Sequence, residues 1–215
     1  MNADQVATLR ALLAPTGWLD RTSAFASALR RSSRTPAGLL VFGPPQDEPW
    51  HMTAHLADES RLAGLPELLP TLVRWAPEPG APAHLSVGLD RLAAATHAET
   101  LLVVSGGLAP AELLERVHDV RRSGATVFAL DQDDPELDQL AHESLQVNPG
   151  TAPISFDAAQ HLVSSAVALG AGPRRFSIAR LPGSGSASSP GAAADRNLRT
   201  RLARLLDAMS GTPTD

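Results

Sequence analysis

Short apolar runs separated by amphipathic stretches recur along the middle of the chain. Three of them are uninterrupted and predict strands buried on both faces of a sheet: GLLVFG (38–43), TLLVV (100–104) and ATVFALD (125–131). Two weaker runs, at 70–75 and 145–147, predict further strands. The sequence thus contains about five strand segments.

The stretches between these runs have apolar residues at helical spacing. Helices are predicted over 50–64, 86–99, 110–122, 134–144 and 156–170. Strands that alternate with helices of this length favour an α/β fold, a three-layer sandwich with a parallel sheet of about five strands.

The composition divides the chain into four parts. Residues 1–37 form an N-terminal helical segment, and 38–170 form the α/β domain. Residues 171–194 are rich in glycine, serine, proline and alanine, which is typical of a flexible linker. Residues 195–210 have an apolar stripe with arginines outside it, which predicts an amphipathic helix that docks on its own body or on a protein partner.

Composition excludes several functions. The 215 residues carry a net charge of −5, so nucleic acid is not an expected partner. The chain has no apolar run long enough for a membrane span and no secretion signal at its start, and it is expected to be cytoplasmic. It has no cysteine, and all 18 of its basic residues are arginine, so thiolate and Schiff-base chemistry are excluded.

The order of three motifs is distinctive. VVSGG (103–107) follows a strand, SGATVFALD (123–131) follows a helix, and PELDQLAHESLQV (135–147) leads to the closing helix. In this order the stretch 38–170 resembles the sugar isomerase (SIS) domain family, which has a flavodoxin-like sandwich. The family includes phosphosugar isomerases and regulators that sense phosphosugars, and its members usually form dimers or tetramers through their helices. The resemblance therefore implies a homo-oligomer.

The family usually binds phosphate with two loops, and both have changed here. The first reads GPPQDEP (43–49), where proline removes backbone donors and Asp47 and Glu48 would repel phosphate. In the second, Val103 and Leu108 replace the serine and threonine of the family pattern Ser-x-Ser-Gly-x-Thr.

Part of the second loop is retained. The candidate ligand-binding residues are Ser105, Gly106 and Gly107, a tight turn that opens a helix and can still hold a small anionic ligand, phosphosugar-like or simpler. The phosphosugar site as a whole is expected to be degenerate.

His51, His55 and Glu59 recur at every fourth residue and lie on one helical face. The phosphoheptose isomerase branch carries a similar His-x-x-x-Glu for metal binding and proton transfer, with a further histidine from the closing helix. That resemblance implies His55, Glu59 and His161 as zinc ligands, with Glu59 and His161 as catalytic residues. The alternative is a solvated helix face with ordinary side-chain pairing and a lone histidine at 161.

Two functions remain open. The first is a non-catalytic or regulatory module that binds a small ligand or oligomerises, which needs no cofactor. The second is a divergent aldose–ketose isomerase of sugar phosphates, with zinc as its cofactor. A calcium site at 131–138 is disfavoured because the acidic run lacks the Asp-x-Asp-x-Asp-Gly register.

Overall fold

The computed structural model describes residues 13–169. The described strands form one five-stranded parallel sheet in the order β2-β1-β3-β4-β5. The strands are β1 (Leu39–Phe42), β2 (Pro70–Leu72), β3 (Thr100–Ser105), β4 (Thr126–Asp131) and β5 (Glu143–Gln146). The predicted α/β fold with a parallel sheet is confirmed.

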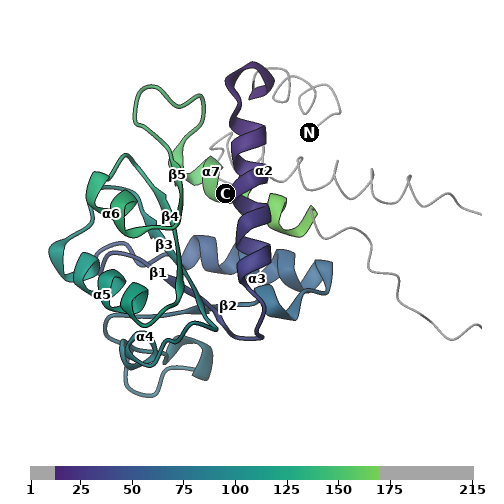
Figure 1. The fold of residues 1–215 in the computed structure, drawn as a ribbon. Coiled ribbons are helices and arrows are strands. Elements are labelled where there is room, and N and C mark those ends of the chain that lie inside the picture. The colour runs from purple at the N-terminus through teal and green to yellow at the C-terminus, as the bar shows by residue number, and fades with distance from the viewer. Residues whose placement is uncertain (1–12, 170–215) are drawn as a thin grey trace, which may run out of the picture.

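Helices cover both faces of this sheet (Figure 1). The helices are α2 (Trp18–Ser32), α3 (Trp50–Ala63), α4 (Asp90–Ala93), α5 (Ala111–Arg122), α6 (Pro135–Leu140) and α7 (Phe156–Leu169). Short 3-10 turns lie at Ala14–Thr16, Pro66–Leu68 and Ala83–Leu85. None of the helices in this part of the chain is both long and apolar enough to span a bilayer.

Alternate strand residues build two separate cores. Leu102 and Val104 of β3 pack with α2, α3 and α7 on one face, whereas Leu101 and Val103 pack with α4, α5 and α6 on the other. All six residues of β3 are buried. The uninterrupted apolar runs in the sequence are therefore explained by burial of the central strands on both faces.

Several predicted elements are shorter than expected. The run at 70–75 gives a strand of three residues, and the stretch 86–99 gives only the single turn of α4. That stretch ends its helix early because Glu99 accepts hydrogen bonds from the backbone and hydroxyl of Thr96, and this local turn competes with helix continuation. Within the N-terminal segment at 1–37, which was predicted to be helical, the structure places α2 from Trp18 to Ser32.

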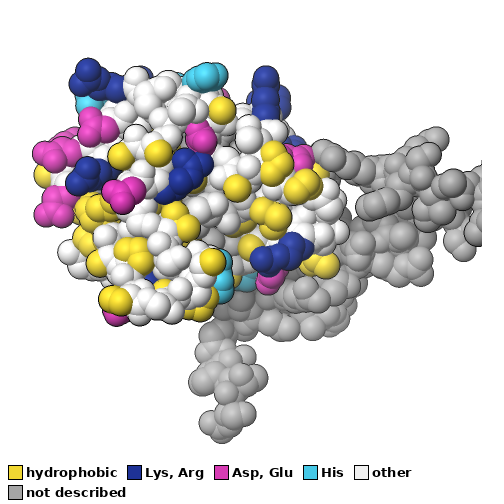
Figure 2. Space-filling model, turned by 90° about the horizontal axis from the view of Figure 1, so that it is seen from below, with side chains coloured by type: hydrophobic (Ala, Val, Ile, Leu, Met, Phe, Trp, Pro, Cys, Tyr) yellow, Lys and Arg dark blue, Asp and Glu magenta, His cyan; other side chains and the backbone are white. Residues whose placement is uncertain are grey.

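Predictions for both ends of the chain fall largely outside the described residues. The linker at 171–194 and the amphipathic helix at 195–210 lie wholly outside them, and so do residues 1–12 of the N-terminal segment. On the face drawn in Figure 2, basic side chains are scattered among acidic and apolar ones and form no continuous patch in the described part of the chain.

Candidate functional site

A cavity of about 350 Å³ lies at the carboxyl edge of the sheet. Its walls come from the loops after β1, β3 and β4 and from the first turns of α3 and α7. The chain passes from β1 outward to β2 and then returns to β3 on the other side, so this is the switch point at which open parallel sheets bind ligands. The cavity is therefore the candidate site.

The first loop is fixed at its start by Gly43. A Cβ atom at this position would lie 2.6 Å from the Val104 carbonyl oxygen and 2.8 Å from Cδ of Pro49. No side chain fits there, so glycine allows the loop to cross closely over the end of β3.

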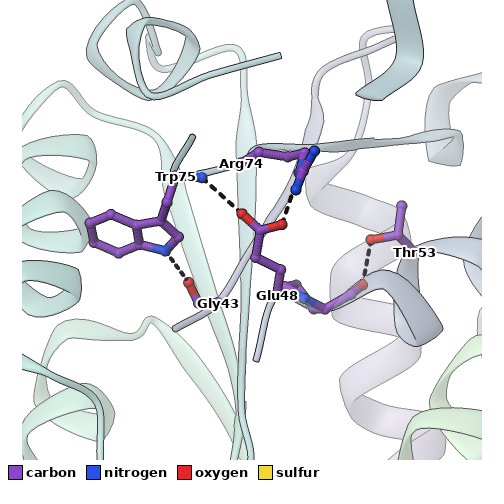
Figure 3. A network of polar contacts seen from close by, with 6 residues as sticks. Gly43, Glu48, Thr53, Arg74 and Trp75 are labelled. Atoms are coloured by element: carbon purple, nitrogen blue, oxygen red, sulfur yellow. Dashed lines mark hydrogen bonds and ion pairs between the residues drawn. The ribbon is translucent and has the colours of Figure 1, made fainter. Parts of the chain in front are cut away.

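Glu48 ties this loop to the end of β2 (Figure 3). Its carboxylate accepts hydrogen bonds from Arg74 Nε at 2.8 Å and from the Trp75 amide at 2.9 Å, while Trp75 Nε1 donates to the Gly43 carbonyl at 2.7 Å. The side chain of Glu48 is only 10% exposed. Glu48 is thus a structural residue whose charge is balanced by Arg74, rather than a free charge facing a ligand.

The second loop differs from a phosphate-binding turn. The Ser105 side chain is fully buried, and its hydroxyl donates to the Gly107 carbonyl at 2.8 Å. Gly106 lines the cavity, and a Cβ atom there would lie 3.5 Å from the Phe156 ring and 3.6 Å from Oδ2 of Asp47. Of the three predicted ligand-binding residues, Gly106 alone lines the cavity.

Three histidines meet beside the cavity. His51 and His55 lie on α3 and His161 lies on α7, which packs against α3. One ring nitrogen from each lies within 4.8 Å of the other two, and the Nε2 atoms of His51 and His161 are 3.0 Å apart. The predicted pair of His55 and His161 therefore does converge, and His51 completes the cluster.

The protein environment favours neutral rings at His55 and His161. Burial, together with the neighbouring His55 and His51, lowers the pKa of His161 to about 4. Burial and the proximity of His51 also lower the pKa of His55. Neutral imidazoles are the form that binds transition metals, so the donor set suits zinc.

Glu59 is half-buried one turn further along α3. No oxygen of Glu59 belongs to the group of ligand atoms that lie within 4.8 Å of one another. The geometry therefore favours three histidines over the predicted set of His55, Glu59 and His161. The four-residue spacing places His51 and His55 on one helix face in the sequence itself, whereas the family resemblance implied Glu59 as the third ligand.

Two further cavity residues were not predicted, Asp157 and Gln160 on the first turns of α7. Asp157 Oδ1 lies 3.6 Å from Nε2 of His51. An acidic residue at a helix start has an ordinary explanation in the helix dipole, so no pattern in the sequence indicates that these residues face a cavity.

Asp131 is a fully buried carboxylate at the end of β4. Its Oδ1 accepts a hydrogen bond from the Asp134 amide, and its Oδ2 accepts none from the described part of the chain. Burial, reinforced by the charge of Asp134, raises the pKa of Asp131 from 3.8 to about 6.

This shift predicts how stability depends on pH. The folded protein holds the Asp131 proton more tightly than the unfolded chain, so the contribution of this group falls as pH rises from 3.8 to about 6. The side chain of an Asp131→Asn variant does not titrate. Its free energy of unfolding, relative to that of wild type, should therefore rise across this window by up to about 3 kcal/mol. Urea unfolding of both proteins on either side of the window measures the difference. Parallel pH profiles would contradict this assignment.

Comparison with known proteins gives matches in structure alone. No family model and no curated protein match the chain. A structure described as a candidate phosphosugar isomerase from Silicibacter pomeroyi DSS-3 is 15% identical with a TM-score of 0.49, covering 92% of this chain and 52% of that one. Another candidate phosphosugar isomerase, from Salmonella typhimurium LT2, is 13% identical with a TM-score of 0.46, covering 72% and 43%.

The sugar isomerase domain of an RpiR transcription factor from Sphaerobacter thermophilus is also similar. It is 12% identical with a TM-score of 0.46, and the match covers 95% of this chain and 98% of that one. This chain spans less than two thirds of the two isomerase structures. Each of these likenesses concerns the fold alone and says nothing of the ligand or activity of this chain.

Proposed function

We propose that this chain is a sugar isomerase-like domain that acts as a non-catalytic or regulatory module. Its cavity binds a small molecule without specific contacts to a phosphate group. The observation that carries the proposal is the chemistry of the cavity wall. Asp47 and Asp157 line it, and none of its described lining residues is an arginine. A phosphate would therefore meet carboxylates where it needs donors.

The inward bond of Ser105 supports the same proposal. A hydroxyl that donates to the Gly107 carbonyl at 2.8 Å is not available to donate to a phosphate oxygen. Each charge-assisted bond that is missing costs roughly 1–3 kcal/mol of binding. Two missing bonds weaken binding by about a hundredfold, since each 1.4 kcal/mol is about tenfold.

Phosphosugar binding tests this proposal directly. We expect glucose 6-phosphate to leave the melting temperature of the purified protein unchanged, because a ligand that does not bind the folded state cannot stabilise it. The measurement is a thermal shift titration at low ionic strength. A saturable rise in melting temperature would overturn the proposal.

A second candidate is a zinc-dependent aldose–ketose isomerase, favoured by the convergence of His51, His55 and His161. These three histidines would hold the ion. Bound zinc polarises a carbonyl oxygen, which is the chemistry that isomerisation needs. In this candidate Glu59, half-buried on the same helix, would carry the proton, and His161 would be a ligand.

Homo-oligomerisation is part of the proposal. The surface of the domain carries two well-exposed leucines, Leu62 on α3 and Leu108 before α5, at 64% and 77%. Exposed apolar side chains near helices are compatible with a dimer or tetramer formed through helical surfaces.

A protein partner for residues 195–210 is likewise proposed from the sequence alone.

A further inference from the structure

The carboxylates around the cavity differ in whether a nearby cation balances their negative charge. Glu48 is bonded to Arg74, whereas no ion pair from the described residues balances Asp47. Asp157 lies 3.6 Å from Nε2 of His51, which carries a charge only when it is protonated. Two carboxylates therefore give the cavity a negative wall, and a wall of this kind attracts cations.

Gln160 is an independent sign of a ligand. Its residue is 7% exposed, and its side chain lines the cavity. Its amide N and O are not among the fully buried unpartnered atoms of the described chain, so they are open to the cavity. A primary amide has two donors and an acceptor, and an amide placed in this way can bond with a ligand that has polar groups of its own.

The remaining wall limits the shape of that ligand. Phe156, Val104 and Pro49 supply apolar surface, and Gln132 adds a second amide from the loop after β4. A volume of about 350 Å³ is at the lower end of the range for small-molecule sites. The cavity thus suits a compact molecule with one apolar side and several hydrogen-bonding groups.

The positive end of α7 does not reverse this charge preference. Asp157 lies in the first turn of the helix, where a carboxylate offsets the partial charge of the free amides. Asp47 faces the same space from the opposite loop, with its Oδ2 near Gly106.

We propose that the cavity binds a small protonated amine that carries hydroxyl groups. The ammonium lies against Asp47 and Asp157, and a hydroxyl bonds with the amide of Gln160. This inference rests on the proposed function, in which the cavity binds a small molecule without specific contacts to a phosphate group.

Three sugars that share the glucose ring separate the possible charges. D-Glucosamine carries an ammonium, D-glucose is neutral, and D-glucose 6-phosphate is anionic. Each is titrated into the full chain by isothermal calorimetry, with a chelator present so that metal ions do not contribute. We expect glucosamine to bind, its affinity to fall with added salt, and the other two sugars to bind about tenfold more weakly or not at all.

Matched variants locate the binding. Asp47→Asn and Gln160→Met should each weaken glucosamine binding by about tenfold, because the first removes the negative charge that faces the ammonium and the second removes the amide, while both keep the side-chain volume nearly constant. Asp119→Asn removes an exposed carboxylate late in α5, outside the cavity, and should leave binding unchanged. Asp47 is exposed, so its substitution does not endanger folding.

The outcomes are distinct. Equal binding of glucose and glucosamine would overturn the amine preference and leave the proposed function standing. Tightest binding of glucose 6-phosphate would overturn both. Failure of all three sugars to bind, or binding that Asp119→Asn weakens as much as Asp47→Asn, would overturn the inference.

Discussion

Replacing His161 with alanine is expected to weaken zinc binding by about a hundredfold or more. The effect should be large because His161 is the member of the histidine cluster that α7 supplies, so its loss leaves only the two histidines of α3. Loss of an outer-shell partner alone typically costs 10–100-fold in metal affinity, and loss of a direct ligand costs more. Competition with a chromophoric chelator, together with the zinc content of the purified protein, provides the measurement.

Two controls separate the possible ligand sets. His118→Ala removes an exposed histidine on α5, outside the cluster, and should leave zinc affinity unchanged. Glu59→Gln should change it little if three histidines form the site, and strongly if the set of His55, Glu59 and His161 is correct. Wild-type protein that takes up no zinc would remove the main support for a metal-dependent isomerase.

Replacing Glu48 with alanine is expected to lower the free energy of unfolding by about 3 kcal/mol. Breaking a buried ion pair by removing one partner costs roughly 3–5 kcal/mol. The lower end applies here because the Arg74 side chain is 18% exposed and regains some hydration. The Trp75 amide also loses its acceptor, which adds to the cost.

Glu48→Gln is the matched control. Its amide oxygen can still accept from the Trp75 amide, so the variant should recover part of the lost stability while the ion pair with Arg74 stays absent. Urea unfolding monitored by tryptophan fluorescence and by circular dichroism gives both free energies. A loss below about 1 kcal/mol in the alanine variant would show that Glu48 behaves like an exposed ion pair.

The central strands were predictable because a strand covered on both faces needs an uninterrupted apolar run; the run at 100–104 is of this kind, and the strand extends one residue further, to Ser105. The run at 70–75 was harder to delimit, since Arg74 and Trp75 leave the strand to contact Glu48 and Gly43. A contact between residues 26 positions apart in the chain leaves no local trace in the sequence.

The candidate site was predictable only in part, because local spacing in the sequence brings together some of its residues and not others. His51 and His55 share a helix face by their spacing alone, but their meeting with His161 depends on how α3 packs against α7. The inward turn of the Ser105 hydroxyl depends on the backbone of a loop. The first fact arises from tertiary packing, and the family resemblance predicted it for His55 and His161. The second arises from the local conformation of the loop, because Ser105 and Gly107 are two positions apart.

The close crossing at Gly43 limits how this protein can acquire new specificity. With 2.6 Å between a hypothetical Cβ and the Val104 carbonyl, any other residue would force two neighbouring strand ends apart. Substitutions that change ligand preference are therefore expected in the exposed part of that loop and at the start of α7. There they alter charge and shape while the backbone crossing at Gly43 stays the same.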